Sequence, residues 1–461
     1  MNGAVDFPLE RAELSFRAAG DSLVRRSVLP SGVRILSEQV PGARSATIGF
    51  WVAVGSRDEQ PADARHPSTF GSTHFLEHLL FKGTQKRTAL DIAVSFDAVG
   101  GEHNAMTAKE YTCYYAKVQD RDLPMAVEVL ADMFTSSLLD RDEFENERDV
   151  ILEEIAMAGD DPADAANERF FEAVLGAHPL GRPIGGSPET IRAVTRDAVW
   201  DHYGENYRPN DLVVTVAGAV DHDALVAAVT THLEGAGWDL GITASPVARR
   251  NNQVADIVRG SAISITQKPI EQVNLYLGTT GLVATDDRRV TMSVLNAIFG
   301  AGMSSRLFQE IRERRGLAYS VYSFAPAYSD AGLFGLYAGC APAKAGQVAE
   351  LMLDELRTLA RDGVTPLEIE RAAGQLGGAS ALALEDSDTR MSRLGRAEIT
   401  LGEFADLDEG LRRIARVTPD DVRALAQSIV DRPFSLAAVG ATSADVFANV
   451  VDVATPTDDA A

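Results

Sequence analysis

Short runs of alternating apolar and polar residues open the patterned part of the chain. VLPSGVRILSEQ at 28–39 predicts two short strands around a Pro-Ser-Gly turn, and ATIGFWVAVGS at 46–56 predicts a buried strand. STHFLEHLLFKG at 72–83 changes to helical spacing. A second helix, a strand and an amphipathic helix are then expected over 90–100, 110–118 and 122–134.

The same order of elements returns in the second half of the chain. Strand, helix, strand and helix are expected there over 272–281, 290–300, 332–340 and 345–360. At one constant offset Tyr115 matches Tyr337 and Glu128 matches Glu350, which indicates an internal duplication. We therefore predict an α+β fold with two duplicated domains, each a mostly antiparallel sheet covered by helices.

The composition between the patterned segments places the domain limits. Gly, Pro and an Arg-Arg-Asn-Asn run mark a linker between the two copies, and the chain ends in ATPTDDAA. The predicted ranges are a flexible N-terminal arm at 1–24, a first α+β domain at 25–235, a linker at 236–258, a second homologous α+β domain at 259–445 and a disordered acidic tail at 446–461.

Composition and charge narrow the class of protein. The 461 residues are 45% apolar and 24% charged, which is typical of globular chains, and the net charge of −24 disfavours nucleic acid and anionic membranes as partners. Two cysteines cannot build a disulfide framework. Because the N-terminus has no apolar signal region and no run of about 18 apolar residues occurs, we expect a soluble cytoplasmic protein.

The helix expected over 72–83 carries the first candidate chemistry. Ser72 or Thr73 is the expected N-cap. His74, Glu77 and His78 fall within one face at 100° per residue. Two imidazoles one turn apart can share a tetrahedral metal ion while the glutamate reaches a water on it, as in the H-x-x-E-H motif.

A catalytic zinc site needs a third protein ligand. EFENERDVILEEIAMAG at 143–159 predicts a helix whose apolar stripe consists of Val150, Ile151 and Ile155. Glu147 and Glu154 lie seven apart on that stripe, and a buried carboxylate is costly unless it is paired or binds a cation. We predict Glu154 as the third ligand and Glu147 as a group that orients a histidine.

Simpler interpretations of the same residues remain open. The histidines and Glu77 can belong to an ordinary helix surface, and the two glutamates can form salt bridges with Arg148 or Arg141.

Five segments together carry a family resemblance. HFLEHLLFKGT, GGEHNAMTAKEYTCYY, ERDVILEEI, HPLGRPIGGSPETI and YRPNDLVVTVAG occur in this order. The chain resembles the insulinase/pitrilysin family of zinc peptidases, and most of all the branch with the β subunit of mitochondrial processing peptidase and its bacterial relatives. The likeness runs from about Val28 to about Gly440.

The resemblance implies a role for each matching residue at the metal. It makes His74, His78 and Glu154 the ligands of one Zn²⁺ per chain. It makes Glu77 the general base and Glu147 an auxiliary glutamate. The fold that it implies is half of a peptidase chamber.

The resemblance also implies substrate contacts away from the metal. EIRERRGLAYSVYS matches the segment whose Arg312 and Tyr319 contact the substrate and stabilise the oxyanion. Asn104 and Ala105 match the edge strand on which the family binds its peptides as an added strand. Without the family, Arg312 would be an exposed member of a basic helix end and Tyr319 a strand core residue.

These observations lead to a zinc metalloendopeptidase that hydrolyses short or unfolded peptides. The alternatives are a presequence-type processing peptidase that cuts near basic residues, or a non-catalytic partner subunit of a peptidase heterodimer. The chain has no long glycine-rich loop of the kind that the α subunit carries. Because the family's chamber needs four such domains, the resemblance implies a homodimer, or a heterodimer with a related chain.

Overall fold

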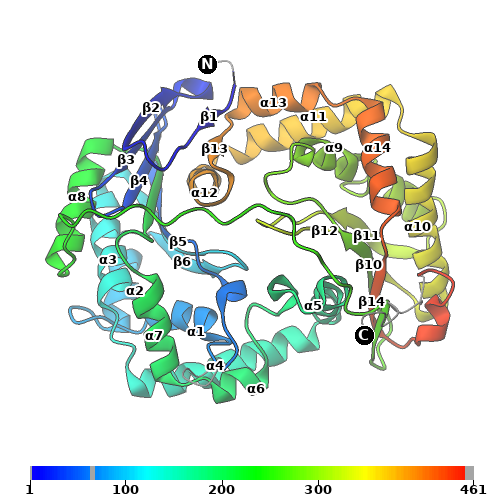
Figure 1. Cartoon of the computed structure of the whole chain (residues 1–461), viewed down its shortest axis with the longest axis horizontal. Coiled ribbons are helices and arrows are strands. Elements are labelled where there is room, and N and C mark those ends of the chain that lie inside the picture. Colours follow the sequence, from blue (N-terminus) through cyan, green and yellow to red (C-terminus); the bar gives the residue numbers. More distant parts are fainter. Residues whose placement is uncertain (1–2, 63–67, 452–461) are drawn as a thin grey trace, which may run out of the picture. The chain divides into compact units, whose positions relative to one another are not determined.

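The chain folds into two compact units. The computed structural model describes residues 3–62 and 68–451 (Figure 1). Unit 1 contains Met1–Ile155, Pro183–Arg250 and Ser380–Glu409, and unit 2 contains Ala156–Arg182, Asn251–Ala379 and Gly410–Ala461.

Unit 1 is built on a seven-stranded sheet. Its order is β2-β3-β4-β8-β5-β7-β6, and only the β4–β8 pair is parallel among its described pairings. The strands are β2 (Glu13–Arg17), β3 (Leu23–Val28), β4 (Arg34–Gln39), β5 (Ser45–Val52), β6 (Glu102–Thr107), β7 (Thr112–Gln119) and β8 (Val213–Gly218). Strand β5 is covered on both faces, so its residues are buried in an unbroken run rather than at every second position.

Unit 2 repeats five neighbouring strands of that sheet, from β4 to β6. They are β9 (Ile263–Gln267), β10 (Val273–Thr280), β11 (Ala318–Phe324), β12 (Leu333–Cys340) and β14 (Ser435–Gly440). Their order β9-β14-β10-β12-β11 matches β4-β8-β5-β7-β6, with one parallel pair, β9–β14, at the same place. The predicted α+β fold with two duplicated, mostly antiparallel sheets is therefore confirmed.

Helices cover both faces of each sheet. The α-helices are α1 (Ser72–Leu80), α2 (Ala89–Asp97), α3 (Leu123–Ser136), α4 (Arg141–Asp160), α5 (Pro162–Leu175), α6 (Pro188–Ala193), α7 (Arg196–Asn206), α8 (His222–Gly235), α9 (Arg289–Phe299), α10 (Ala345–Asp362), α11 (Pro366–Ala383), α12 (Ser387–Arg396), α13 (Leu407–Ala415) and α14 (Pro419–Val430). Two π-helices, η5 (Phe308–Glu313) and η7 (Ala397–Leu401), interrupt the regular helices. Of the helices in the described ranges, none has the length and apolarity to span a bilayer.

The two units exchange one helix each. On unit 1, α3 and α8 cover one face of the sheet, and α12 packs on the other against β4, β5 and β8. On unit 2, α9, α10 and α14 cover one face, and α5 packs on the other against β10 and β14. Because α5 lies between α4 and β8 of the first copy, and α12 between α11 and β14 of the second, neither unit is a continuous stretch of chain.

The N-terminal segment differs from the expected flexible arm at 1–24. Residues 13–17 form strand β2, which extends the sheet of unit 1 by pairing with β3. Residues 5–6 form β1, which pairs with β13 (Glu403–Phe404), and Phe7 is fully buried beside Phe404. The arm prediction is wrong for two reasons. Strand β2 forms a local hairpin with β3, and its alternating burial was overlooked in the sequence, whereas the partners of β1 and Phe7 lie far along the chain.

The expected linker and tail also contain ordered parts. Within the expected linker, unit 1 extends to Arg250 and unit 2 resumes at Asn251. Arg249 donates to the carbonyl oxygen of Glu398 and Arg250 to the carboxylate of Asp58, both in unit 1. Val450 and Val451 are buried in the core of unit 2, so the disordered tail does not begin at residue 446. The rest of the predicted tail, 452–461, lies outside the described residues.

Candidate metal centre

Helix α1 presents His74 and His78 on a rigid base. Its inner face buries Phe75, Leu76, Leu79 and Leu80. Its N-cap is Gly71, in a left-handed conformation with φ 88°, rather than the expected Ser72 or Thr73. The carboxylate of Glu59 accepts hydrogen bonds from the N–H groups of Gly71 at 2.8 Å and Thr73 at 2.9 Å. This cap comes from a residue outside the helix, so local sequence could not show it.

A buried histidine on α7 also contacts the first turn of α1. His202 Nε2 lies 3.4 Å from Thr73 Oγ1. Burial lowers the pKa of His202 from 6.5 to about 4, so the imidazole is neutral in the folded protein at neutral pH.

Acidification is therefore expected to destabilise the metal-free protein through His202. The unfolded chain binds this proton as the pH falls through 6.5, whereas the folded chain resists until about pH 4, so stability is lost across that window. We expect His202 to account for about 2 kcal/mol of the loss between pH 7 and pH 5. Urea unfolding of wild type and His202→Gln at both pH values checks this. Equal losses in the two proteins would contradict it.

Helix α4 presents Glu147 and Glu154 toward α1. Glu147 is only 3% exposed and Ile151 is buried beside it, as the stripe predicted. Val150 is exposed, and the Glu154 side chain is 47% exposed, so the expectation that both glutamates face inward is wrong for Glu154. An exposed third donor is compatible with a catalytic site, because such a site keeps one position open.

The structure brings His74, His78 and Glu154 together. Glu154 Oε2 lies 3.8 Å from His74 Nε2 and 3.5 Å from His78 Nε2. One ligand atom from each residue lies within 4.8 Å of the others. Donors that share one tetrahedral Zn²⁺ lie about 3.3 Å apart, so two imidazoles and a carboxylate in this arrangement fit zinc after small side-chain movements.

The charge state of His74 suits a metal ligand. Burial, and the nearby imidazole of His78, lower the pKa of His74, while the carboxylates of Glu77 and Glu154 act in the opposite direction. A neutral imidazole is the form that binds a metal ion. Nδ1 of His74 is buried without a hydrogen-bond partner in the described part of the chain, and a Cβ at Gly185 would lie 3.7 Å from it.

His78 has the partner that His74 lacks. Its Nδ1 lies 2.8 Å from Glu147 Oε2, and the other carboxylate oxygen, Oε1, lies 2.6 Å from the ammonium group of Lys82. The simpler interpretation paired Glu147 with Arg148 or Arg141, but Arg148 binds Glu145 instead. Sequence reasoning missed Lys82, although its spacing of four residues from His78 places both on one face of α1 and its C-terminal turn.

Strand β6 lies at the open edge of the unit 1 sheet and contacts α1. Asn104 and Ala105 both belong to it. The N–H of Ala108 bonds the carbonyl of Tyr111 across the hairpin, so the alternation of the ladder turns the N–H and C=O of Ala105 away from β7. The N–H of Ala105 accordingly donates to the side chain of Asn104 at 2.8 Å.

Comparison with protein-family models shows which family the chain belongs to. A family model described as "Insulinase (Peptidase family M16)" matches residues 34–187, and one described as "Peptidase M16 inactive domain" matches 193–376. The chain belongs to the M16 family. The predicted resemblance is thus confirmed at the level of the family.

Three curated relatives match this chain over most of its length. A protein of Streptomyces coelicolor is 48% identical, with 91% of this chain and 90% of the relative covered. Proteins of Mycobacterium tuberculosis and Bacillus subtilis are 45% and 37% identical, with 90% of this chain and 93% and 98% of the relatives covered. All three are named as uncharacterized zinc proteases.

Solved structures share the M16 fold. The structure of a peptidase M16 inactive domain from Pseudomonas fluorescens has a TM-score of 0.80 at 19% identity, and covers 91% of this chain and 98% of its own. A protease from Helicobacter pylori has a TM-score of 0.79 at 22% identity, and covers 90% and 99%. At these identities the likeness establishes the fold alone.

Of the three remaining predicted residues, Glu77 is half-buried on α1, and Arg312 and Tyr319 lie in the second M16 domain, within unit 2. Arg312 belongs to the π-helix η5, and its guanidinium lies between two rings, 4.6 Å from the centre of Phe308 and 5.0 Å from that of Tyr319. A bulge between Ala318 and Ser320 in edge strand β11 turns Tyr319 outward, 77% exposed. Tyr319 is therefore not the core residue that its strand alone indicates.

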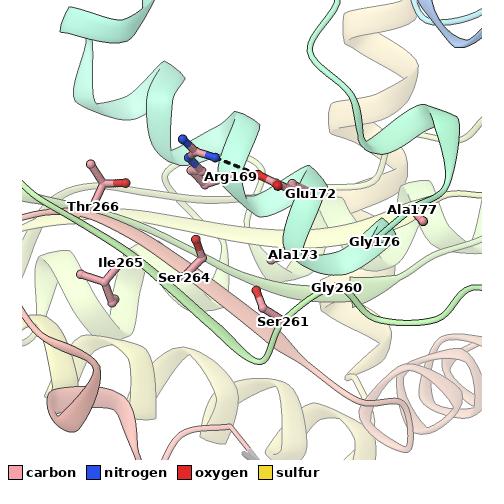
Figure 2. Close-up of a pocket in the computed structure, with 10 residues that line it drawn as sticks. All are labelled: Arg169, Glu172, Ala173, Gly176, Ala177, Gly260, Ser261, Ser264, Ile265 and Thr266. Carbon is pink, nitrogen blue, oxygen red and sulfur yellow. Dashed lines mark hydrogen bonds and ion pairs between the residues drawn. The ribbon is translucent and has the colours of Figure 1, made fainter. Parts of the chain in front are cut away.

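Unit 2 also contains a polar hollow of about 470 Å³ between α5 and β9 (Figure 2). Its charged lining residues, Arg169 and Glu172, form an exposed ion pair at 2.9 Å. Ser261, Ser264 and Thr266 supply hydroxyl groups along its floor. None of the predicted site residues lines this hollow, and its charges are already paired, so we assign it no role in the chemistry.

Proposed function

We propose that this M16 protein is a zinc metalloendopeptidase that hydrolyses short or unfolded peptides. His74, His78 and Glu154 would hold one Zn²⁺. The observation that carries the proposal is the convergence of these three donors, from helices far apart in the sequence, to within 4.8 Å. A non-catalytic partner subunit would not require such a donor set.

The residues around the three donors fit the chemistry of peptide hydrolysis. When bound, Zn²⁺ supplies a Lewis acid that lowers the pKa of water and polarises a carbonyl oxygen. Glu77, half-buried on the same helix, accepts a proton from the attacking water and passes it to the nitrogen of the leaving amine. Glu147 holds the imidazole of His78 through Nδ1, which leaves Nε2 free to bind the metal.

The second M16 domain is proposed to contribute Arg312 and Tyr319 to substrate binding. Arg312 has five donors for a peptide carbonyl, and the hydroxyl of Tyr319 can donate to a developing oxyanion. Their stacking against each other, and the exposure of Tyr319, support this role.

The test of the function is zinc content together with cleavage. Purified protein should hold about one zinc per chain and cut an unstructured peptide. Chelation should abolish cleavage and added Zn²⁺ should restore it, whereas His74→Ala should bind no zinc. Cleavage that survives complete zinc removal would overturn the proposal. Mapping the cuts by mass spectrometry would show whether they cluster beside basic residues, as the processing alternative requires.

We propose that substrates bind by adding a strand to β6. Ala105→Pro should then raise KM by about 3- to 10-fold with little change in kcat, because it removes one outward N–H without removing a β6–β7 hydrogen bond. Proline is tolerated where an edge-strand N–H faces solvent. Ala105→Ser keeps the N–H and is the matched control. An unchanged KM in a normally folded Pro variant would exclude binding at this position.

We also propose that two copies associate to complete the chamber that the family resemblance implies. Light scattering should then give twice the chain mass of 49.4 kDa. A monomer with full peptidase activity would contradict this part of the proposal.

A further inference from the structure

Lys82 is the one cation found in contact with the carboxylate that holds His78, among the described residues. Helix α1 ends at Leu80, and the N–H groups of Phe81 and Lys82 bond the carbonyls of His78 and Leu79. These bonds continue the helical path for one more turn, so Lys82 stays on the face of His78. Gly83, with φ 126°, then turns the chain away.

The carboxylate of Glu147, on α4, bridges Lys82 and His78. Glu147 Oε1 lies 2.6 Å from Lys82 Nζ and Oε2 lies 2.8 Å from His78 Nδ1. The side chain of Glu147 is buried, so its charge needs partners, and it has three rotatable bonds. Contacts at both carboxylate oxygens meet the first need and hold the side chain in one orientation. Lys82 supplies the contact at the oxygen that faces away from the histidine.

We propose that Lys82 is a positioning residue for the zinc site, acting on His78 through Glu147. The proposal rests on the proposed function, since it assigns His78 to the metal. Without the ammonium group, the carboxylate of Glu147 is free to leave its place, and the imidazole of His78 loses the acceptor that fixes its ring. Partners that orient metal ligands in this way typically change metal affinity by about 10- to 100-fold when they are replaced.

The charge of Lys82, acting only through space, predicts the opposite change in zinc affinity. An ammonium group near a divalent cation repels it, so removal of Lys82 would tighten zinc binding if the charge acted only through space. Positioning predicts weaker binding. The direction of the change therefore separates the two effects.

The experiment measures the zinc dissociation constant by competition with a chelator, in the purified full chain. Lys82→Met removes the charge at similar length and should weaken zinc binding by about 10-fold. Lys82→Arg keeps a cation beside Glu147 and should stay within about threefold of wild type. Lys86→Met, at an exposed lysine of the following turn, is the matched control and should leave the constant unchanged.

Co²⁺ absorption of the same variants reports ligand geometry independently of peptidase activity, and should change for Lys82→Met only. Thermal melts of the metal-free proteins identify any variant that fails to fold. If Lys82→Met does so, Lys82→Ala, which removes the same ammonium group, carries the test with the same expected weakening of zinc binding. Unchanged or tighter zinc binding in a folded Lys82→Met protein would overturn the inference while the proposed function stands. A wild type that binds no zinc, or that binds it equally after His74→Ala, would instead overturn the proposed function.

Discussion

Replacing Glu77 with Gln is expected to lower kcat for peptide cleavage by about 10²- to 10⁴-fold and to leave zinc content unchanged. The amide has nearly the size of the carboxylate but cannot accept the proton of the attacking water. Because the three proposed ligands are His74, His78 and Glu154, the metal should stay in place. Single-turnover cleavage of an unstructured peptide, with zinc measured on the same sample, gives both numbers.

The matched control is the same Glu→Gln change at a nearby glutamate. Glu153 is exposed on α4, next to the proposed ligand Glu154, and Glu153→Gln should keep kcat within about twofold. Equal cleavage by wild type and Glu77→Gln would mean that another group accepts the proton. Loss of zinc together with activity would mean that Glu77 supports the metal rather than the proton transfer.

The helical period was sufficient to predict which polar residues of α1 share one face. His74, Glu77 and His78 share a face whenever the segment is helical, and the buried Phe75, Leu76 and Leu79 guarantee that it is. The partners of that face were harder to predict. The spacing of four residues places Lys82 on the face of His78, but its contact with Glu147 depends on how α4 packs, and Glu59 caps α1 from outside the helix.

The repeated order of strands and helices along the chain was predictable, because each copy carries its own hydrophobic pattern. The order of the strands within each sheet was not predicted. The exchange of α5 and α12 was not, since a helix shows which of its faces is apolar but not which sheet will cover it. A related limit explains Phe7, whose burial depends on Phe404, a residue that a pattern along the chain does not connect to the N-terminus. Strand β2 differs, because its alternating pattern and its nearby partner β3 could have been predicted as a hairpin.

Unit 1 has a second charged centre, the Glu398 cluster, whose role is structural. The Glu398 side chain on η7 is fully buried and lies 3.1, 3.6 and 3.5 Å from the guanidinium groups of Arg26, Arg34 and Arg249. These arginines come from β3, β4 and the segment after α8. Burial lowers the pKa of Arg34 and of Arg249, and the carboxylate of Glu398 acts in the opposite direction.

Glu398→Gln is therefore expected to lower the free energy of unfolding by about 3–5 kcal/mol, because it leaves three clustered cations without their counter-ion. Urea unfolding measures the change, and Glu385→Gln, at an exposed acid of the same unit, should change it by less than about 0.5 kcal/mol. If charge rather than packing causes the loss, adding Arg34→Met to Glu398→Gln should recover part of it, since one buried cation is then removed. A double variant less stable than Glu398→Gln alone would assign the loss to packing, and the cluster would then hold unit 1 together by shape rather than by charge.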